Sequence, residues 1–262
     1  IPAFLVDDKA TFDKLSSKAS LSYAITEDAS TYFSVSEGFR SGGFNPGFDS
    51  AYKPESIISY ELGAKASLLD SQFNAEVAIF HSKYSDYQDT TADALTGFGI
   101  IGNPGEAKIQ GLEWSTQFRV TEQLRFGFSG NIMDAEFTTV DPDFPSVNEG
   151  DPLFLIPKYS YSLNIDYDFN WSSIISGFAH LDYNRQGANS QINRSPIFLN
   201  PVNESTDIGF LNAQIGAQWM DVTIRLFGRN LNNELRATAG SVNGVFTQNR
   251  PRTVGVDVNY QF

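Results

Sequence analysis

Residues 250–262 at the carboxy terminus read RPRTVGVDVNYQF, and their two-residue period sets the expectation for the whole chain. Apolar side chains occupy alternate positions, namely Val254, Val256, Val258, Tyr260 and Phe262. Small or polar residues fill the places between them, which is the pattern of a strand with one apolar and one polar face. A tilted strand of about 10 residues can cross the hydrocarbon of a membrane. The stretch therefore predicts either a membrane-crossing strand or the last strand of a soluble β-sandwich.

The same alternation recurs along the chain and predicts about eleven strands. They are expected at 15–25, 31–40, 57–69, 73–86, 107–120, 124–132, 159–169, 175–183, 211–219, 222–226 and 254–262. The connections between them alternate between short and long. Short ones are expected at 27–30, 70–71, 121–122, 170–171 and near 221, and long ones at 41–56, 87–106, 140–157, 186–207 and 231–249.

This sorting of connections separates the two readings of the strands. Outer-membrane barrels have tight turns at the periplasmic rim and long loops outside, whereas a Greek-key sandwich has no reason to sort its connections. Trp171 and Trp219 both lie near predicted short turns, where an aromatic girdle would meet the lipid–water boundary. The pattern therefore favours an all-β, transmembrane antiparallel barrel.

The predicted polar faces carry charged residues that a dry core would not accommodate. These are Glu61, Lys65, Glu76, Arg125, Asp166, Arg225 and Asp257. Each would cost several kcal/mol if buried without a partner in an apolar interior. We therefore expect the polar faces to line a wide hydrated pore or to contact a polar plug, and the apolar faces to contact lipid.

Composition excludes several other classes of protein. The 262 residues carry a formal charge of -13, which argues against nucleic acid as a partner, and the absence of cysteine removes disulfides and thiolate metal sites. The mean hydropathy of -0.25 is compatible with a barrel, because only alternate residues contact lipid. The chain has no apolar run near the roughly 20 residues of a membrane helix.

No catalytic, metal or cofactor site is predicted. His81 and His180 are the only histidines, and GxSxG and HExxH are absent, so we expect no enzyme. An acidic segment contains Asp141, Asp143, Glu149 and Asp151, but it lacks the spacing of an EF-hand loop. We interpret it as a solvated loop rather than a calcium site.

Several segments together resemble the carboxy-terminal barrel segment of TonB-dependent outer-membrane receptors. They are YFSVSEGFRSGGFNPGF at 32–48, KPESIISYELGAK at 53–65, GLEWS at 111–115, FGRNLNNE at 227–234 and the terminal PRTVGVDVNYQF. Each motif alone is weak, and their order and spacing carry the resemblance over nearly the whole chain. Members of this family close 22 strands around an amino-terminal plug. The resemblance implies that residues 1–262 are the carboxy-terminal portion of such a barrel, about half of it, without the plug domain.

The resemblance also implies a function, a location and partners. The protein would be an outer-membrane active transporter and receptor for a scarce ligand such as an iron–siderophore complex. Its long loops would be extracellular and its carboxy terminus periplasmic. Its partners would be the TonB complex, through a plug outside this chain, the remaining half of the barrel, and outer-membrane lipid and lipopolysaccharide. Whether a surface lipoprotein covers the loops is open.

Loop-borne aromatic and cationic residues are the candidates for ligand contact under this reading: Phe39, Arg40, Phe44, Arg185, Arg194 and Arg236. An anionic iron chelate would favour the arginines, and a sugar would favour the aromatic residues. The competing interpretation is that these residues pack within loops or contact lipopolysaccharide. The alternative functions are a passive porin of fewer strands and a soluble β-sandwich adhesin or carbohydrate-binding module.

Overall fold

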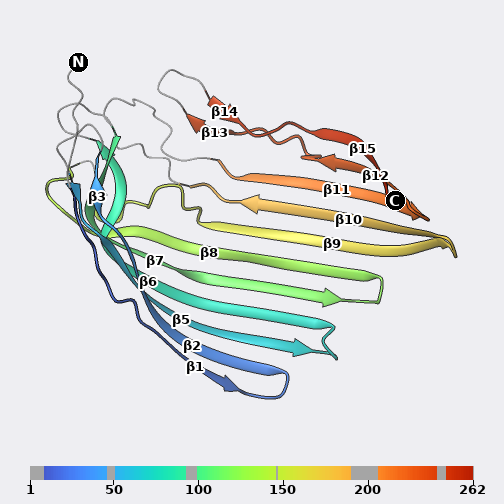
Figure 1. Ribbon diagram of the computed structural model, residues 1–262, viewed down its shortest axis with the longest axis horizontal. Helices are drawn as coiled ribbons and strands as arrows, with labels where there is room; N and C mark the ends of the chain where they lie inside the picture. The colour runs from blue at the N-terminus through green and yellow to red at the C-terminus, as the bar shows by residue number, and fades with distance from the viewer. Residues whose placement is uncertain are drawn as a thin grey trace.

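The computed structural model describes residues 9–45, 51–92, 99–145, 147–189, 206–240 and 246–261, and its dominant feature is one 11-stranded antiparallel sheet (Figure 1). In spatial order the strands are β1 (Lys18–Ala24), β2 (Ala29–Arg40), β5 (Glu55–Leu68), β6 (Phe73–Ala92), β7 (Gly99–Arg119), β8 (Leu124–Val140), β9 (Tyr159–Ser172), β10 (Ile175–Gln186), β11 (Ile208–Trp219), β12 (Val222–Arg229) and β15 (Thr253–Tyr260). The predicted number of strands is confirmed. The described part of the chain holds no helix with the length and hydropathy needed to span a bilayer.

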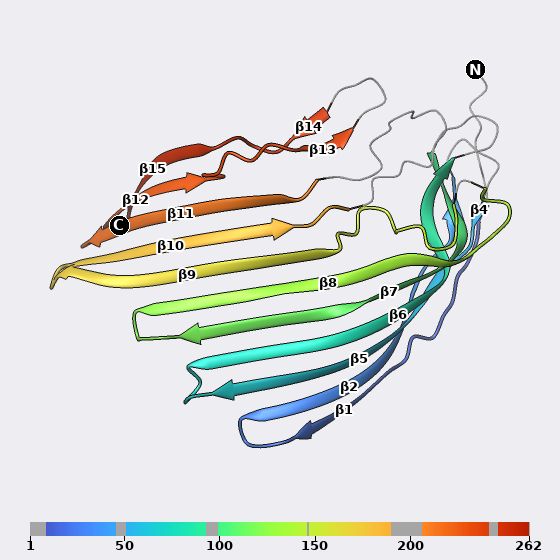
Figure 2. The same cartoon turned by 180° about the vertical axis from the view of Figure 1, so that it is seen from behind.

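Neighbours in sequence are neighbours in the sheet, so β1 and β15 form its two edges (Figures 1 and 2). Two small hairpins lie within the loops. They are β3 (Gly43–Phe44) with β4 (Ala51–Tyr52), and β13 (Ala237–Gly240) with β14 (Phe246–Gln248). Each edge strand pairs with a single neighbour among the described residues. The sheet is thus an open wall with two free edges.

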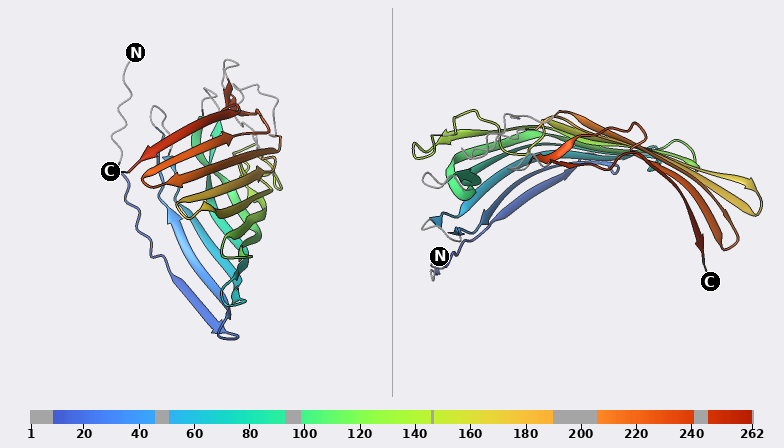
Figure 3. Two further views of the ribbon diagram at one scale, coloured as in Figure 1. Left: turned by 90° about the vertical axis from the view of Figure 1, so that its right-hand side faces the viewer. Right: turned by 90° about the horizontal axis from the view of Figure 1, so that it is seen from above.

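The wall is curved, and its concave side is the side seen in Figure 1 (Figure 3). Strand register aligns apolar residues on the convex face; Ile215, for example, lies opposite Leu226, which lies opposite Val256. These three side chains are 45%, 50% and 65% exposed, although they belong to the apolar set. Exposed apolar side chains on every strand of one face mean that this face needs an apolar partner outside the chain.

Aromatic residues bound this apolar band at both ends. Tyr161 contacts Phe128 and Tyr183 toward the long loops, and Trp171 contacts Phe169 toward the short turns. Tyr161 and Trp171 share the convex face of β9 ten positions apart, which is about 33 Å along a strand and about 25 Å across a membrane at a tilt near 40°. That height matches the apolar band of outer-membrane barrels.

Between the aromatic row at Tyr161 and the long loops, the convex face becomes polar. His81 on β6 contacts Gln110 on β7 at 3.1 Å, and Gln110 donates to Asp134 on β8 at 3.2 Å. Two residue pairs further along, on the same face, Lys108 Nζ lies 2.9 Å from Glu136 Oε1. The strands therefore continue past the apolar band into a hydrated layer on the long-loop side.

The predicted sorting of connections is confirmed, because short turns gather at one end of the wall and long loops at the other (Figure 1). Two predicted connections were wrong. The turn expected at 170–171 lies instead at 173–174, because β9 continues to Ser172 and a register shift at Ile175 absorbs the extra residues. The loop expected at 87–106 is mostly strand, because β6 reaches Ala92 and β7 begins at Gly99.

The long loop after β8 has its own small hydrophobic core. Phe137 and Leu153 are 0% exposed and cluster with Ala107 and Val147. Backbone bonds hold the loop beside β8, with Leu153 N donating to Ala135 O at 3.1 Å. The loop therefore has a packed apolar core, while Asp141, Asp143 and Glu149 are exposed, as the interpretation of a solvated acidic segment predicts.

Candidate functional site: the concave face and the loop rim

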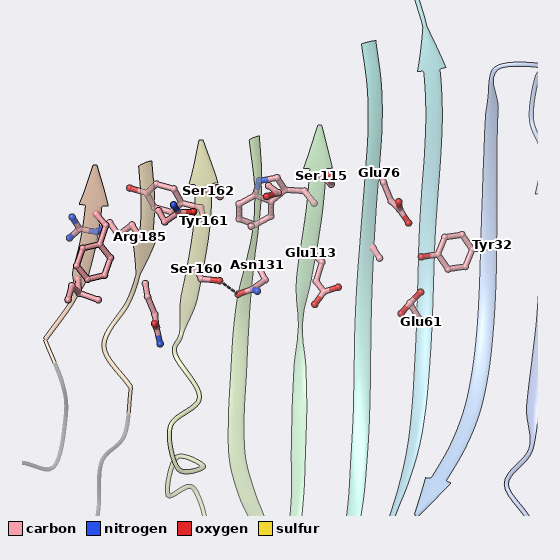
Figure 4. A pocket seen from close by; sticks show the side chains of 18 residues that line it. Tyr32, Glu61, Glu76, Glu113, Ser115, Asn131, Ser160, Tyr161, Ser162 and Arg185 are labelled. Atoms are coloured by element: carbon pink, nitrogen blue, oxygen red, sulfur yellow. Dashed lines mark hydrogen bonds between the residues drawn. The ribbon is translucent and has the colours of Figure 1, made fainter. Parts of the chain in front are cut away.

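The concave face carries an acidic patch on three adjacent strands. Glu61 on β5, Glu76 on β6 and Glu113 on β7 all line one hollow of this face (Figure 4). Lys65 Nζ pairs with Glu76 Oε1 at 2.7 Å, whereas Glu61 and Glu113 make no ion pair among the described residues. Tyr32 lies beside Glu61 (Figure 4). Its ring covers Gly63, where a Cβ atom would come within 2.4 Å of the ring. Glycine at 63 is therefore required for this aromatic contact.

The same hollow is a groove of about 710 Å³ that runs from the acidic patch across β7 to β11. Its floor is made of short polar side chains, because Ser115, Ser129 and Ser162 are direct cross-strand partners. Ser160 Oγ donates to Asn131 Oδ1 at 3.2 Å on the same floor (Figure 4). Short hydroxyl and amide groups leave room for water or for another polar surface against the wall.

The other half of the concave face holds two arginine–aspartate ion pairs and a histidine–aspartate contact. Arg125 Nη2 lies 2.8 Å from Asp168 Oδ2, and Arg225 Nη2 lies 3.6 Å from Asp257 Oδ2. His180 Nδ1 lies 2.8 Å from Asp166 Oδ1. The exposed fractions of these side chains lie between 29% and 52%, so the predicted placement of charges on a hydrated face is confirmed.

Three of the predicted ligand-contact residues lie at the β2 end of the rim. Phe39 and Arg40 are the last residues of β2, where they lie opposite Ser56 and Glu55. Alternation directs Phe39 to the convex side and Arg40 to the concave side. Phe44 belongs to the small β3–β4 hairpin beyond them.

Two others, Arg185 and Arg236, lie at the opposite end of the rim, and both contact the segment 206–207 that precedes β11. Arg185 Nη2 lies 3.1 Å from Asp207 Oδ2, and Arg236 Nη1 donates to Thr206 O at 2.6 Å. Arg185 also donates to the hydroxyls of Tyr159 and Tyr183, each at 3.4 Å, on the convex side of β10. The structure therefore does not gather the predicted residues into one site. Arg194 lies outside the described residues.

Asp207 is a contact residue that the sequence did not point to. It accepts hydrogen bonds from Tyr159 Oη, Arg185 Nη2 and the backbone N of Ala188. The Tyr159 hydroxyl, followed by the Arg185 guanidinium and the Ala188 amide, holds the pKa of the Asp207 carboxyl below its ordinary value. This cluster anchors the segment before β11 to the rim of β10.

A second anchor fixes the loop between β2 and β5. Asn45 and Ile101 exchange hydrogen bonds at 2.8 and 2.9 Å, and Asn103 donates to Lys53 O at 3.0 Å. Gln88 is 6% exposed and donates to Ser41 O at 2.9 Å. Amide side chains thus hold this loop against the ends of β6 and β7 nearest the long loops. No motif or periodicity in the sequence pointed to these amide residues.

Two acidic residues of the loop after β8 accept hydrogen bonds from the backbone of the same loop. Asp141 Oδ1 accepts from the backbone N of Asp143 at 3.0 Å, and Asp151 Oδ2 accepts from the backbone N of Asn148 at 2.8 Å. Within the described ranges no group of three or more acidic or histidine side chains is arranged to hold a metal ion.

Comparison with known families identifies the wall. Residues 3–231 match the model of the family described as TonB dependent receptor-like, beta-barrel. The pesticin receptor of Yersinia pestis is 24% identical over 97% of this chain, and the probable TonB-dependent siderophore receptor PiuA of Acinetobacter baumannii is 24% identical over 50% of it. The chain spans 37% of the pesticin receptor and 18% of PiuA.

Solved structures show the same fold at low sequence identity. The ferric yersiniabactin uptake receptor FyuA of Yersinia pestis has a TM-score of 0.76 at 21% identity, over 94% of this chain and 37% of that one. The ferric-catecholate import receptor Fiu of E. coli K12 in its closed form has a TM-score of 0.70 at 18% identity, over 94% and 34%. The predicted partial barrel is confirmed by these likenesses, and the chain belongs to the family of TonB-dependent receptor β-barrels.

Proposed function

We propose that residues 1–262 form part of the wall of an outer-membrane receptor that imports a scarce ligand by energy coupling through TonB. The single observation that supports this most is the two-faced wall. Its convex face is apolar between two aromatic rows about 25 Å apart, and its concave face is polar and charged. A wall of this kind separates lipid from a wide aqueous lumen.

Strands from outside this chain would complete the barrel. The free edges of β1 and β15 would be costly in a membrane, because an unpaired backbone N–H or C=O in hydrocarbon costs several kcal/mol. We propose that further strands pair with both edges and that a plug domain fills the lumen against the concave face. Mass spectrometry of the intact native protein tests this. A 29.0 kDa species without a covalent or associated partner would contradict it.

The orientation follows from the same reading. The long loops would be extracellular, and the short turns and the carboxy terminus would be periplasmic. Lipopolysaccharide would surround the polar convex layer that contains Lys108 and Glu136. Labelling of intact cells with a membrane-impermeant thiol reagent tests this, because a single cysteine placed in the 141–158 loop should react and one in the 120–123 turn should not.

An iron chelate is the ligand class that the comparisons favour. The similar structures include proteins described as ferric yersiniabactin and ferric-catecholate receptors. We propose that the rim residues Phe39, Arg40, Phe44, Arg185, Arg194 and Arg236 contribute to capture of such a ligand. For Arg185 the contribution would be indirect, through the segment that it anchors with Asp207.

Uptake by living cells tests the function. Cells that express the full-length receptor should accumulate radioactive iron from a matching ferric siderophore, and the uptake should disappear when TonB is absent. Saturable uptake that needs TonB supports the importer. Energy-independent flux that depends only on solute size would instead support a passive porin, and no uptake of any ferric chelate would contradict the proposal.

A further inference from the structure

A small cavity on the concave face lies between β10, β11 and β12, apart from the acidic patch. Its volume is about 260 Å³, and we call it the β12 pocket. The residues that characterise it are Arg225, Phe227, Arg229, His180, Asn212 and Gln214. None of them belongs to the loop rim.

Two guanidinium groups flank one aromatic ring in this pocket. Arg225, Phe227 and Arg229 occupy alternate positions of β12 and therefore share its concave face. The Cζ atoms of Arg225 and Arg229 lie 5.9 and 5.3 Å from the Phe227 ring centroid. The ring is pressed against β15 over Gly255, where a Cβ atom would come within 2.6 Å of it. Phe227 thus holds the two cations on one surface.

One carboxylate, that of Asp182, also lines the pocket, and other groups already engage it. Asp182 Oδ2 accepts from Asn212 Nδ2 at 2.7 Å and from Asn184 Nδ2 at 2.8 Å. Its second oxygen, Oδ1, lies 3.5 Å from His180 Nε2. These contacts hold both carboxylate oxygens on the β10 and β11 side of the pocket, and Asp182 makes no ion pair with Arg225 or Arg229.

The arginines retain unused donors. Arg225 Nη1 donates to Gln214 Oε1 at 3.3 Å and Nη2 lies 3.6 Å from Asp257, but its Nε is buried without a partner. Arg229 is exposed, makes no ion pair with any residue in the described ranges, and places its guanidinium over the Phe227 ring. A buried guanidinium N–H without an acceptor is destabilising, and a guanidinium fork matches the two oxygens of a carboxylate.

We propose that the β12 pocket binds a carboxylate or a comparable oxyanion inside the barrel lumen. This inference rests on the proposed function, because it takes the concave face as the lumen wall. The acidic patch on β5 to β7 repels anions, so an anion in the lumen would be drawn to the β12 side. The oxyanion comes either from an acidic side chain of the plug or from an anionic ligand during passage.

The test uses the full-length receptor in detergent, with Arg229 as the varied residue. R229Q removes the guanidinium that has no ion pair, so it should fold normally. R252Q is the matched control, because Arg252 is exposed like Arg229 but lies outside the pocket, where it donates to Leu231 O at 3.4 Å. Binding of radioactive citrate, a tricarboxylate probe, is measured for both variants. R229K and R252K are also treated with a carbodiimide, which joins an amine to a carboxylate in contact with it.

Two outcomes support the proposal and identify the source of the anion. If the wild-type receptor and R252Q bind citrate and R229Q binds it about tenfold more weakly, the pocket takes a free anion. If R229K, but not R252K, becomes cross-linked to a plug peptide, the pocket takes a plug carboxylate.

The proposal is overturned if R229Q binds citrate as R252Q does and R229K forms no cross-link. Iron uptake by the same variants separates this failure from that of the proposed function. If uptake is normal and depends on TonB, but R229Q binds citrate as R252Q does and R229K forms no cross-link, only the anion site in the β12 pocket is rejected. If the wild-type receptor shows no uptake, the proposed importer function is rejected.

Discussion

Asn230 holds the end of β12 to two later segments through one side-chain amide. Its Nδ2 donates to Glu234 O at 2.8 Å and to Arg250 O at 3.0 Å, and its Oδ1 accepts from Glu234 N at 2.9 Å. The residue is 5% exposed and has a φ of 50°, a left-handed conformation that Asn tolerates. The NLNNE segment, which contributed to the family resemblance, is therefore a structural clasp.

N230D should destabilise the receptor because it keeps the acceptor oxygen but loses both donated bonds and sets a charge beside two carbonyl oxygens. The expected cost is about 1–3 kcal/mol, seen as a lower apparent Tm in detergent. N170D, at an exposed position of β9, is the control and should change little. Equal Tm values for the two variants would mean that the clasp does not stabilise the fold.

The Asp207 cluster should respond to acid. The pKa of Asp207 is lowered from 3.8 in the folded protein, so its stabilising contribution is complete above that value and is lost as pH falls through the folded pKa. The backbone amide of Ala188, which donates to Asp207 at 2.8 Å, should keep its hydrogen-exchange protection at pH 5 and lose it progressively below about pH 3.8. In D207N this step should be absent, and a step of equal size in D207N would assign the pH effect to another group.

At the scale of elements, the strands were predictable because each has one face that contacts an apolar environment. The two-residue alternation of apolar side chains disappears where both faces of a strand contact water or loops. For this reason the sequence did not predict the last residues of β6 or the first residues of β7. A bulge at Asp86, with a φ of 51°, also shifts the alternation there. The β12 pocket could not be predicted beyond the face of each residue, since the neighbours of Phe227 on β11 and β15 depend on strand register.

The loop after β8 should lose its fold when its core is removed. F137A deletes a 0% exposed ring that contacts Tyr87, with centroids 5.6 Å apart, and should cost about 3–5 kcal/mol of local stability. Hydrogen exchange and proteolysis across 141–158 should rise sharply, while the strands below keep their protection. F154A, which removes a ring 41% exposed in the same loop, should have little effect. Equal effects of the two variants would show that the loop has no packed core.

At the scale of the whole molecule, adjacent residues of one strand should differ in their tolerance of charge. Leu163 on β9 lies on the convex face and is 41% exposed, and Ser162 beside it lines the concave groove. L163K should cost about 2–4 kcal/mol in a membrane and reduce the yield of assembled receptor, whereas S162K should assemble normally. Equal yields of both variants would argue against a lipid-facing side.

The most direct test of the two-faced wall is the environment of each residue along β9 in lipid vesicles. The chain has no cysteine, so a nitroxide can be attached to single cysteines at positions 160 to 169 of the full-length receptor. Collision with oxygen should be highest at odd positions, including Leu163 and Ile165. Collision with a water-soluble nickel chelate should be highest at even positions, including Ser162 and Asn164. Uniform exclusion of both reagents from the odd positions would show that the apolar face is buried in protein, and would contradict a wall between lipid and a watery lumen.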